Sequence, residues 1–150
     1  MASIEYGFAT VSDLDDLLAL YAVLRPQYPA YVRGDAEKAL ASLLGQPHLR
    51  LIVARFDQRV VATCRLALLA NIGRASRPLG LLEYVVTAGP FQRKGIGQQM
   101  LGFALDVAWH LDCCKVVLLS GTQRDLAHML YEELGFRGDR EHGFFIDAPL

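Results

Sequence analysis

The sequence has few cysteines, no long apolar run and no excess of charge of either sign. The three cysteines, Cys64, Cys113 and Cys114, include no C-x-x-C pair and fit a reducing cytosol as small core residues. The histidines are scattered, so we expect no metal. No stretch approaches about 18 consecutive apolar residues, and residues 1–9 lack the basic start of an export signal. We therefore expect a cytoplasmic protein with no membrane partner.

Charge and composition exclude two further classes of protein. Fifteen Lys and Arg residues against sixteen Asp and Glu give a formal charge of -1, so the basic excess that favours nucleic acid is missing. With 53% hydrophobic and 21% charged residues, the chain is not of the disordered type. Its 150 residues are typical of one domain, and we expect a single domain over residues 1–150.

Apolar periodicity and Gly or Pro breaks divide the chain into alternating strands and helices. The predicted strands are Ile4–Ala9, Leu49–Phe56, Val60–Leu69, Leu81–Thr87, Lys115–Leu119, Phe136–Gly138 and Gly143–Ile146. The predicted helices run from Ser12 to just before Pro26 and over Asp35–Leu44, Gly97–Leu111 and Asp125–Leu134. A strand, a long helix and a strand in succession imply a parallel or crossover pairing, so we expect an α/β fold.

The most informative segment joins the strand that ends at Thr87 to the following helix. Amides at a helix start lack intrahelical partners and lie at the positive end of the helix dipole, so an anion there satisfies several donors. Gly95 and Gly97 would let phosphate oxygens approach the backbone, and Arg93 and Lys94 add positive charge. A merely flexible helix start is the alternative. The spacing fits neither a P-loop nor a dinucleotide fingerprint.

The arrangement Q-R-K-G-I-G at 92–97 resembles the [QR]-x-x-G-x-[GA] signature of the GNAT superfamily of acyl-CoA-dependent N-acetyltransferases. L-E-Y-V-V-T at 82–87 resembles the fourth strand of that family, and A-H-M-L-Y-E-E-L-G-F at 127–136 resembles its last helix and the turn into the sixth strand. The first eighty residues match only in their order of elements. The resemblance implies a mixed, mostly antiparallel central sheet with helices on both faces and splayed fourth and fifth strands.

The resemblance also implies acetyl-CoA as the acetyl donor. In the family, the CoA pyrophosphate lies on the amides of the signature loop, and the pantetheine arm bonds the backbone of the fourth strand. The residues expected at the coenzyme are therefore Val85, Val86, Thr87, Gln92, Arg93, Lys94, Gly95, Ile96, Gly97 and Gln98. Arg124 stands where many members have asparagine. It is a candidate for the CoA phosphate or a substrate carboxylate, with simple solvent exposure as the alternative.

Two residues are candidates for proton transfer. An alkylamine has a pKa of about 10.4 and attacks only as the neutral base, so its proton must be accepted. Glu83 is the only charge in an apolar strand and is the first candidate acceptor, with an exposed strand start as the alternative. Tyr131 matches the tyrosine of L-Y-E-x-L-G-F and could donate to the departing thiolate; the alternative is an aromatic packed on the sheet.

The sequence says least about the acceptor. Arg25, Tyr28 and Tyr31 lie in the connection where family members bind their acceptors, although ordinary loop residues would look the same. We expect an N-acetyltransferase that acts on a primary amine of a small molecule or peptide by direct attack in a ternary complex. A non-catalytic acyl-CoA-binding sensor or interaction module is the main alternative, and a generic nucleotide-binding protein is a weaker one. The resemblance also makes a homodimer through the C-terminal strands plausible.

Overall fold

The computed structural model describes residues 3–120 and 125–149. The chain forms two compact units, Met1–Leu118 and Leu119–Leu150. The prediction of one domain over residues 1–150 stays a prediction. No helix within the described ranges is long and apolar enough to cross a membrane.

The described helices and strands follow the predicted order, and those predicted before residue 135 have bounds within one or two residues of the prediction. The strands are β1 (Ile4–Phe8), β2 (Leu49–Phe56), β3 (Arg59–Leu69), β4 (Leu79–Thr87) and β5 (Lys115–Leu118). The α-helices are α1 (Leu14–Leu24), α2 (Arg33–Leu44), α3 (Ile96–His110) and α4 (Asp125–Glu133).

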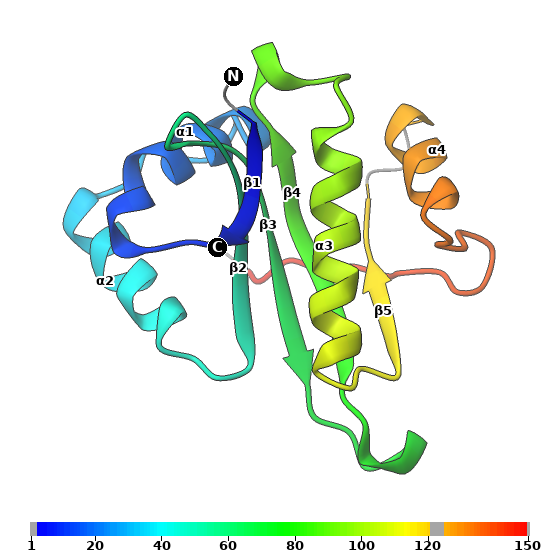
Figure 1. Cartoon of the computed structure of the whole chain (residues 1–150). Coiled ribbons are helices and arrows are strands. Elements are labelled where there is room, and N and C mark those ends of the chain that lie inside the picture. The colour runs from blue at the N-terminus through cyan, green and yellow to red at the C-terminus, as the bar shows by residue number, and fades with distance from the viewer. Residues whose placement is uncertain (1–2, 121–124, 150) are drawn as a thin grey trace. The chain divides into compact units, whose positions relative to one another are not determined.

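The five strands of the first unit form one mixed sheet in the order β1-β2-β3-β4-β5. The first three pairings are antiparallel, and β4 pairs with β5 in parallel. The long helix α3 makes the crossover that a parallel pair requires (Figure 1). The expected mixed, mostly antiparallel sheet is confirmed.

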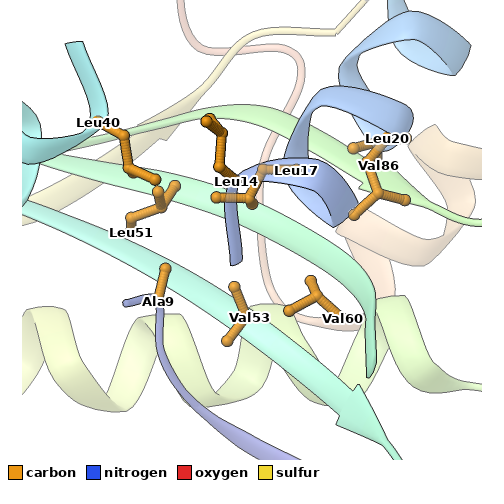
Figure 2. Packing of buried hydrophobic residues seen from close by; sticks show 9 residues of the cluster. All are labelled: Ala9, Leu14, Leu17, Leu20, Leu40, Leu51, Val53, Val60 and Val86. Atoms are coloured by element: carbon orange, nitrogen blue, oxygen red, sulfur yellow. The ribbon is translucent and has the colours of Figure 1, made fainter. Parts of the chain in front are cut away.

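Helices cover both faces of this sheet. Helices α1 and α2 lie on one face and α3 lies on the other (Figure 1). Figure 2 shows the apolar cluster under α1 and α2, which consists of Ala9, Leu14, Leu17, Leu20, Leu40, Leu51, Val53, Val60 and Val86. Residues that alternate with these strand positions, such as Ile52 and Leu82, are fully buried, as are Met100 and Leu101 of α3. Burial of each such side chain stabilises the fold by roughly 1.5–3 kcal/mol.

Helix α1 begins at Leu14, two residues after the Ser12 at which the sequence predicted its start. Ser12 lies in a short 3-10 turn, Val11–Asp13, and its hydroxyl is 2.8 Å from the hydroxyl of Thr10. The Thr10 amide donates to Asp13 Oδ2 at 2.8 Å, and α1 begins one residue later. The Asp13 carboxylate therefore organises this helix start, and it also forms an ion pair with Arg55 of β2.

The second unit contains α4 and the C-terminal segment. Gly135, with φ of 101°, ends the helix, and the Phe136 amide returns to the Tyr131 carbonyl at 3.0 Å. The strands predicted at Phe136–Gly138 and Gly143–Ile146 are wrong, because residues 136–149 form no strand. A strand requires a neighbour that supplies its hydrogen bonds, and short apolar runs flanked by glycine do not specify one.

Candidate active site

One edge of β4 is open along its second half. The parallel pairing with β5 runs from Leu79 opposite Lys115 to Leu82 opposite Leu118. Strand β4 continues to Thr87, whereas β5 ends at Leu118. From Glu83 onward, β4 therefore keeps its pairing with β3 but has no β5 partner within the described chain. The fourth and fifth strands part at this point, as the resemblance implied.

A β-bulge lies where the two strands part. Thr63 of β3 pairs with Val86 and Arg65 pairs with Glu83, so Tyr84 and Val85 together oppose one residue of β3. Tyr84 has a φ of 53°, in the left-handed region that residues other than glycine rarely adopt. A bulge bends the strand and increases its twist. It thus gives a physical reason for β4 to separate from β5.

The loop before α3 presents a row of backbone donors to solvent. Gly95 precedes the helix with a φ of 79°, and Arg93 also has a positive φ, of 62°. The amides from Arg93 to Gln98 donate no hydrogen bond to any described residue, and Arg93, Lys94 and Gly95 are exposed. Because unpaired amides at the positive end of a 15-residue helix favour an anion, the loop fits a phosphate group.

The loop is attached to the end of β4. Gln92 Nε2 donates to the Thr87 carbonyl at 3.0 Å. A Cβ added to Gly97 would lie 3.5 Å from the Thr87 hydroxyl oxygen, so these two residues are in close contact. The Ala88 amide donates across to Val61 of β3 at 2.8 Å. An anion-binding helix start and an open strand edge therefore adjoin each other, which matches a ligand that carries both a diphosphate and amide groups.

Glu83 lies within β4 and not at its exposed start. Its Oε2 accepts a hydrogen bond from Arg65 Nη2 at 2.6 Å, and the two residues are directly opposite in the β3–β4 register. The side chains of Glu83 and Arg65 are 34% and 29% exposed. The carboxylate is thus held at the start of the open edge while part of it reaches solvent.

Two tyrosine rings, here called the aromatic group, lie beside this ion pair on the α1 face of the sheet. The Arg65 guanidinium lies 4.7 Å from the centroid of the Tyr84 ring, and Tyr84 packs on Tyr21 of α1 with centroids 5.5 Å apart. Burial raises the pKa of Tyr21 to about 12, so its phenol stays protonated at neutral pH. Tyr31 lies near enough to contribute to this shift.

The residues predicted to bind the acceptor lie just after α1. Arg25 ends α1 and its Nη1 donates to the Leu24 carbonyl, and the Tyr28 amide donates to the Arg25 carbonyl at 3.1 Å. Tyr28 and Tyr31 are exposed. Of the three, only Tyr31 is among the groups that influence the pKa of Tyr21. The sequence did not indicate that Arg65, Tyr84 and Tyr21 lie beside Glu83. To predict this, the register between β3 and β4 would have been needed.

One predicted site residue, Tyr131, belongs to the second unit. Tyr131 lies on α4, where its ring meets that of Phe136 edge-on with centroids 6.3 Å apart. Arg124 lies outside the described residues. Phe136 follows the glycine that ends α4, so the L-Y-E-E-L-G-F segment forms the helix end that the motif predicts.

Neither buried cysteine offers an activated nucleophile. Cys64 and Cys113 are buried, and burial raises the pKa of both thiols, to about 12 for Cys64. Thiols with such pKa values stay protonated and react poorly. Over the described ranges, no group of three or more His, Cys, Asp or Glu side chains could hold a metal ion.

The sequence model described as the acetyltransferase (GNAT) family matches residues 17–136. This chain belongs to that family. GNAT proteins are acetyl-CoA-dependent N-acetyltransferases, and the protein is accordingly an acetyltransferase. The open β4 edge and the loop before α3 are the parts of this GNAT fold that the sequence motif had indicated.

Solved structures agree with this assignment of fold. A structure from Agrobacterium tumefaciens named as an acetyltransferase is 35% identical, with a TM-score of 0.91 over 96% of this chain and 99% of its own. Glucosamine-6-phosphate N-acetyltransferase from Arabidopsis thaliana is 16% identical, with a TM-score of 0.82 over 98% of both chains. An aminoglycoside N-acetyltransferase in complex with CoA is also 16% identical, with a TM-score of 0.81 over 99% and 97%. The last two show likeness of fold alone. A comparison with curated proteins found no significant match.

Proposed function

We propose that this GNAT acetyltransferase transfers the acetyl group of acetyl-CoA to a primary amine of a small molecule or peptide by direct attack in a ternary complex. The observation that carries the proposal is the row of unpartnered amides from Arg93 to Gln98 beside the open edge of β4. Each feature alone is common, but together they suit a ligand with a diphosphate at one end and an amide-containing arm.

The loop and the strand edge divide the binding of the coenzyme between them. The amides of the loop, with the nearby charges of Arg93 and Lys94, bind the diphosphate. Val85 to Thr87 pair with the amides of the pantetheine arm, as a peptide adds to a free strand edge. Acetyl-CoA supplies an activated acetyl thioester at the far end of this arm.

Two proton transfers must accompany the transfer of the acetyl group. One proton leaves the amine as its nitrogen forms a bond to the acetyl carbon, and Glu83 accepts it, directly or through water. One proton reaches the sulfur as the carbon–sulfur bond breaks, and the phenol of Tyr131 donates it. Glu83 is suited to its role because it is partly exposed at the start of the open edge.

Direct attack is favoured over an acetyl-cysteine intermediate. A covalent route needs a thiolate, and the buried Cys64 and Cys113 have pKa values raised by burial. The acceptor therefore meets the thioester itself. We place the acceptor on the α1 side of the sheet, near Tyr31, with Arg25 and Tyr28 at its margin.

A free-thiol assay tests the proposal. Purified protein with acetyl-CoA should release thiol only when an acceptor is added from a panel of amino sugars, polyamines, aminoglycosides and peptides. Isothermal titration should show that CoA binds far better than ATP, because ATP has no pantetheine arm. Coenzyme binding without any amine-dependent thiol release would overturn the proposal and leave a coenzyme-binding module.

A further inference from the structure

Arg65 contacts two consecutive residues of the neighbouring strand. Its Nη2 donates to Glu83 Oε2 at 2.6 Å, and its guanidinium lies over the Tyr84 ring, 4.7 Å from the centroid. These two residues stand at the start of the β4 bulge, where β5 leaves the sheet. One side chain of β3 therefore engages the candidate proton acceptor and the strained residue next to it.

The contacts of Arg65 suit a positioning role better than a stabilising one. An ion pair that is about one-third exposed contributes little to stability, because water screens it. Tyr84 is held in a left-handed conformation at φ 53°, and residues in that region cluster at functional sites. The guanidinium is planar, so it can stack face to face on a ring while its N–H groups donate in the plane to a carboxylate, whereas an ammonium has no flat face to stack.

The second contact of Tyr84 completes the arrangement. Its ring packs on Tyr21 of α1, with centroids 5.5 Å apart. Tyr21 is partly buried and packs against the apolar cluster of that helix, so it can support the Tyr84 ring. Tyr21, Tyr84 and Arg65 thus form a chain of contacts that runs from the apolar cluster to the Glu83 carboxylate.

We propose that Arg65 is a positioning residue for acetyl transfer, which fixes the Glu83 carboxylate at the open edge of β4 by holding one of its oxygens. The inference rests on the proposed function. Oε2 is engaged by Arg65, and Oε1 accepts no hydrogen bond from any described residue. Oε1 is then the atom presented to the acceptor amine or to a bridging water. Loss of the guanidinium would leave the carboxylate free to rotate away.

A double-mutant cycle tests this coupling. As a single substitution, Arg65→Met should lower kcat for the acceptor roughly 10- to 100-fold. The reason is that a misplacement of a catalytic group by about 1 Å can lower the rate about a hundredfold. KM for acetyl-CoA should change less than about threefold. In a Glu83→Gln background, the same Arg65→Met change should lower kcat less than about threefold, since the group it positions is gone. Arg65→Lys should restore only part of the lost rate, because it keeps the charge without the stacking.

Arg59→Met is the matched control. Arg59 also lies on β3 and pairs with an aspartate, Asp16 of α1, at 2.6 Å, and its side chain makes no hydrogen bond to a described residue of β4. This variant should leave kcat unchanged. The change in its melting temperature measures how much stability is lost with an ion pair between β3 and a neighbouring element. If Arg65→Met does not fold, the same non-additivity with Glu83→Gln is expected for Arg65→Lys.

The outcomes separate the inference from the function on which it rests. No amine-dependent thiol release by the unmodified protein overturns the proposed function and this inference with it. Normal release with additive effects of the Arg65 and Glu83 changes overturns the inference alone. An unchanged kcat in Arg65→Met at intact folding does the same.

Discussion

Gln92 donates a hydrogen bond from Nε2 to the carbonyl oxygen of Thr87 at 3.0 Å, which joins the loop before α3 to the last residue of β4. The two parts of the proposed coenzyme site are therefore linked by a hydrogen bond before any ligand binds. A ligand that binds both parts gains from this, since less conformational freedom is lost on binding.

Gln92→Ala should weaken coenzyme binding without unfolding the protein. A hydrogen bond of this kind contributes about 0.5–1.5 kcal/mol, so the dissociation constant of CoA should rise roughly 2- to 10-fold. Isothermal titration measures it. Gln99→Ala is the control, because Gln99 Oε1 accepts from the Tyr6 hydroxyl at 3.0 Å, away from β4. Equal affinities in the two variants would contradict the role given to Gln92.

Gly95→Ala should lower coenzyme affinity more strongly. The φ of 79° at Gly95 is costly for a residue with a Cβ, by about 1–3 kcal/mol, so the loop would relax and its amides would turn away. We expect the dissociation constant of CoA to rise about tenfold. Gly102→Ala, inside α3 with open space at its Cβ, should leave affinity unchanged and stabilise the helix by up to about 1 kcal/mol. Unchanged binding in Gly95→Ala would remove this loop from the coenzyme site.

Tyr131→Phe should slow turnover while CoA still binds normally. The phenylalanine keeps the ring contact with Phe136 and loses only the hydroxyl. General acid assistance is typically worth a factor of about 10²–10⁴, and kcat in the free-thiol assay should fall within this range. A variant as fast as the unmodified protein would exclude Tyr131 as the proton donor.

Asp13 should make the stability of the first unit sensitive to acid. Hydrogen bonds from Arg55, at 2.7 and 2.6 Å, hold the pKa of the Asp13 carboxyl below its usual value of 3.8. Because the folded-state pKa is the lower one, this stabilisation is complete above about pH 4 and is lost as the pH falls through the folded-state value. Asp13→Asn should reduce the free energy of unfolding at pH 7 by about 2 kcal/mol and flatten its decline below pH 4.

Chemical denaturation at several pH values measures this effect. Asp15→Asn is the control, because Asp15 pairs with Arg33 on the surface and its side chain is 76% exposed. That variant should be as stable as the unmodified protein throughout. An Asp13→Asn profile parallel to that of the unmodified protein would show that the ion pair does not titrate as described.

The bounds of most elements could be predicted because local signals set them. Gly45 and Pro47 end the second helix, and Gly95 precedes the third. The loop of the proposed coenzyme site could be predicted equally well, since its glycines and cations are close together in the sequence. The family resemblance then supplied the splayed strands, which no periodicity shows.

What the sequence did not reveal depends on pairing between distant segments. Arg65 and Glu83 are 18 positions apart and meet only because β3 and β4 adopt one register. The bulge was hidden because Tyr84 is a normal strand former, and its left-handed conformation is imposed by the sheet. The opposite error occurred near the C-terminus, where residues 143–146 have strand-like composition but no hydrogen-bonded neighbour.

The single additional residue of β4 has a consequence for how such a site can be lost or redesigned. Side chains alternate between the two faces of a sheet. The additional residue therefore moves every later side chain of β4 to the opposite face from the one that an uninterrupted strand would give it. Deletion of Val85 would restore uninterrupted alternation and let a lengthened β5 continue alongside β4. The result would be a more regular sheet in which the backbone groups of β4 are hydrogen-bonded to β5. No backbone group of this strand edge would then remain free to bind a coenzyme.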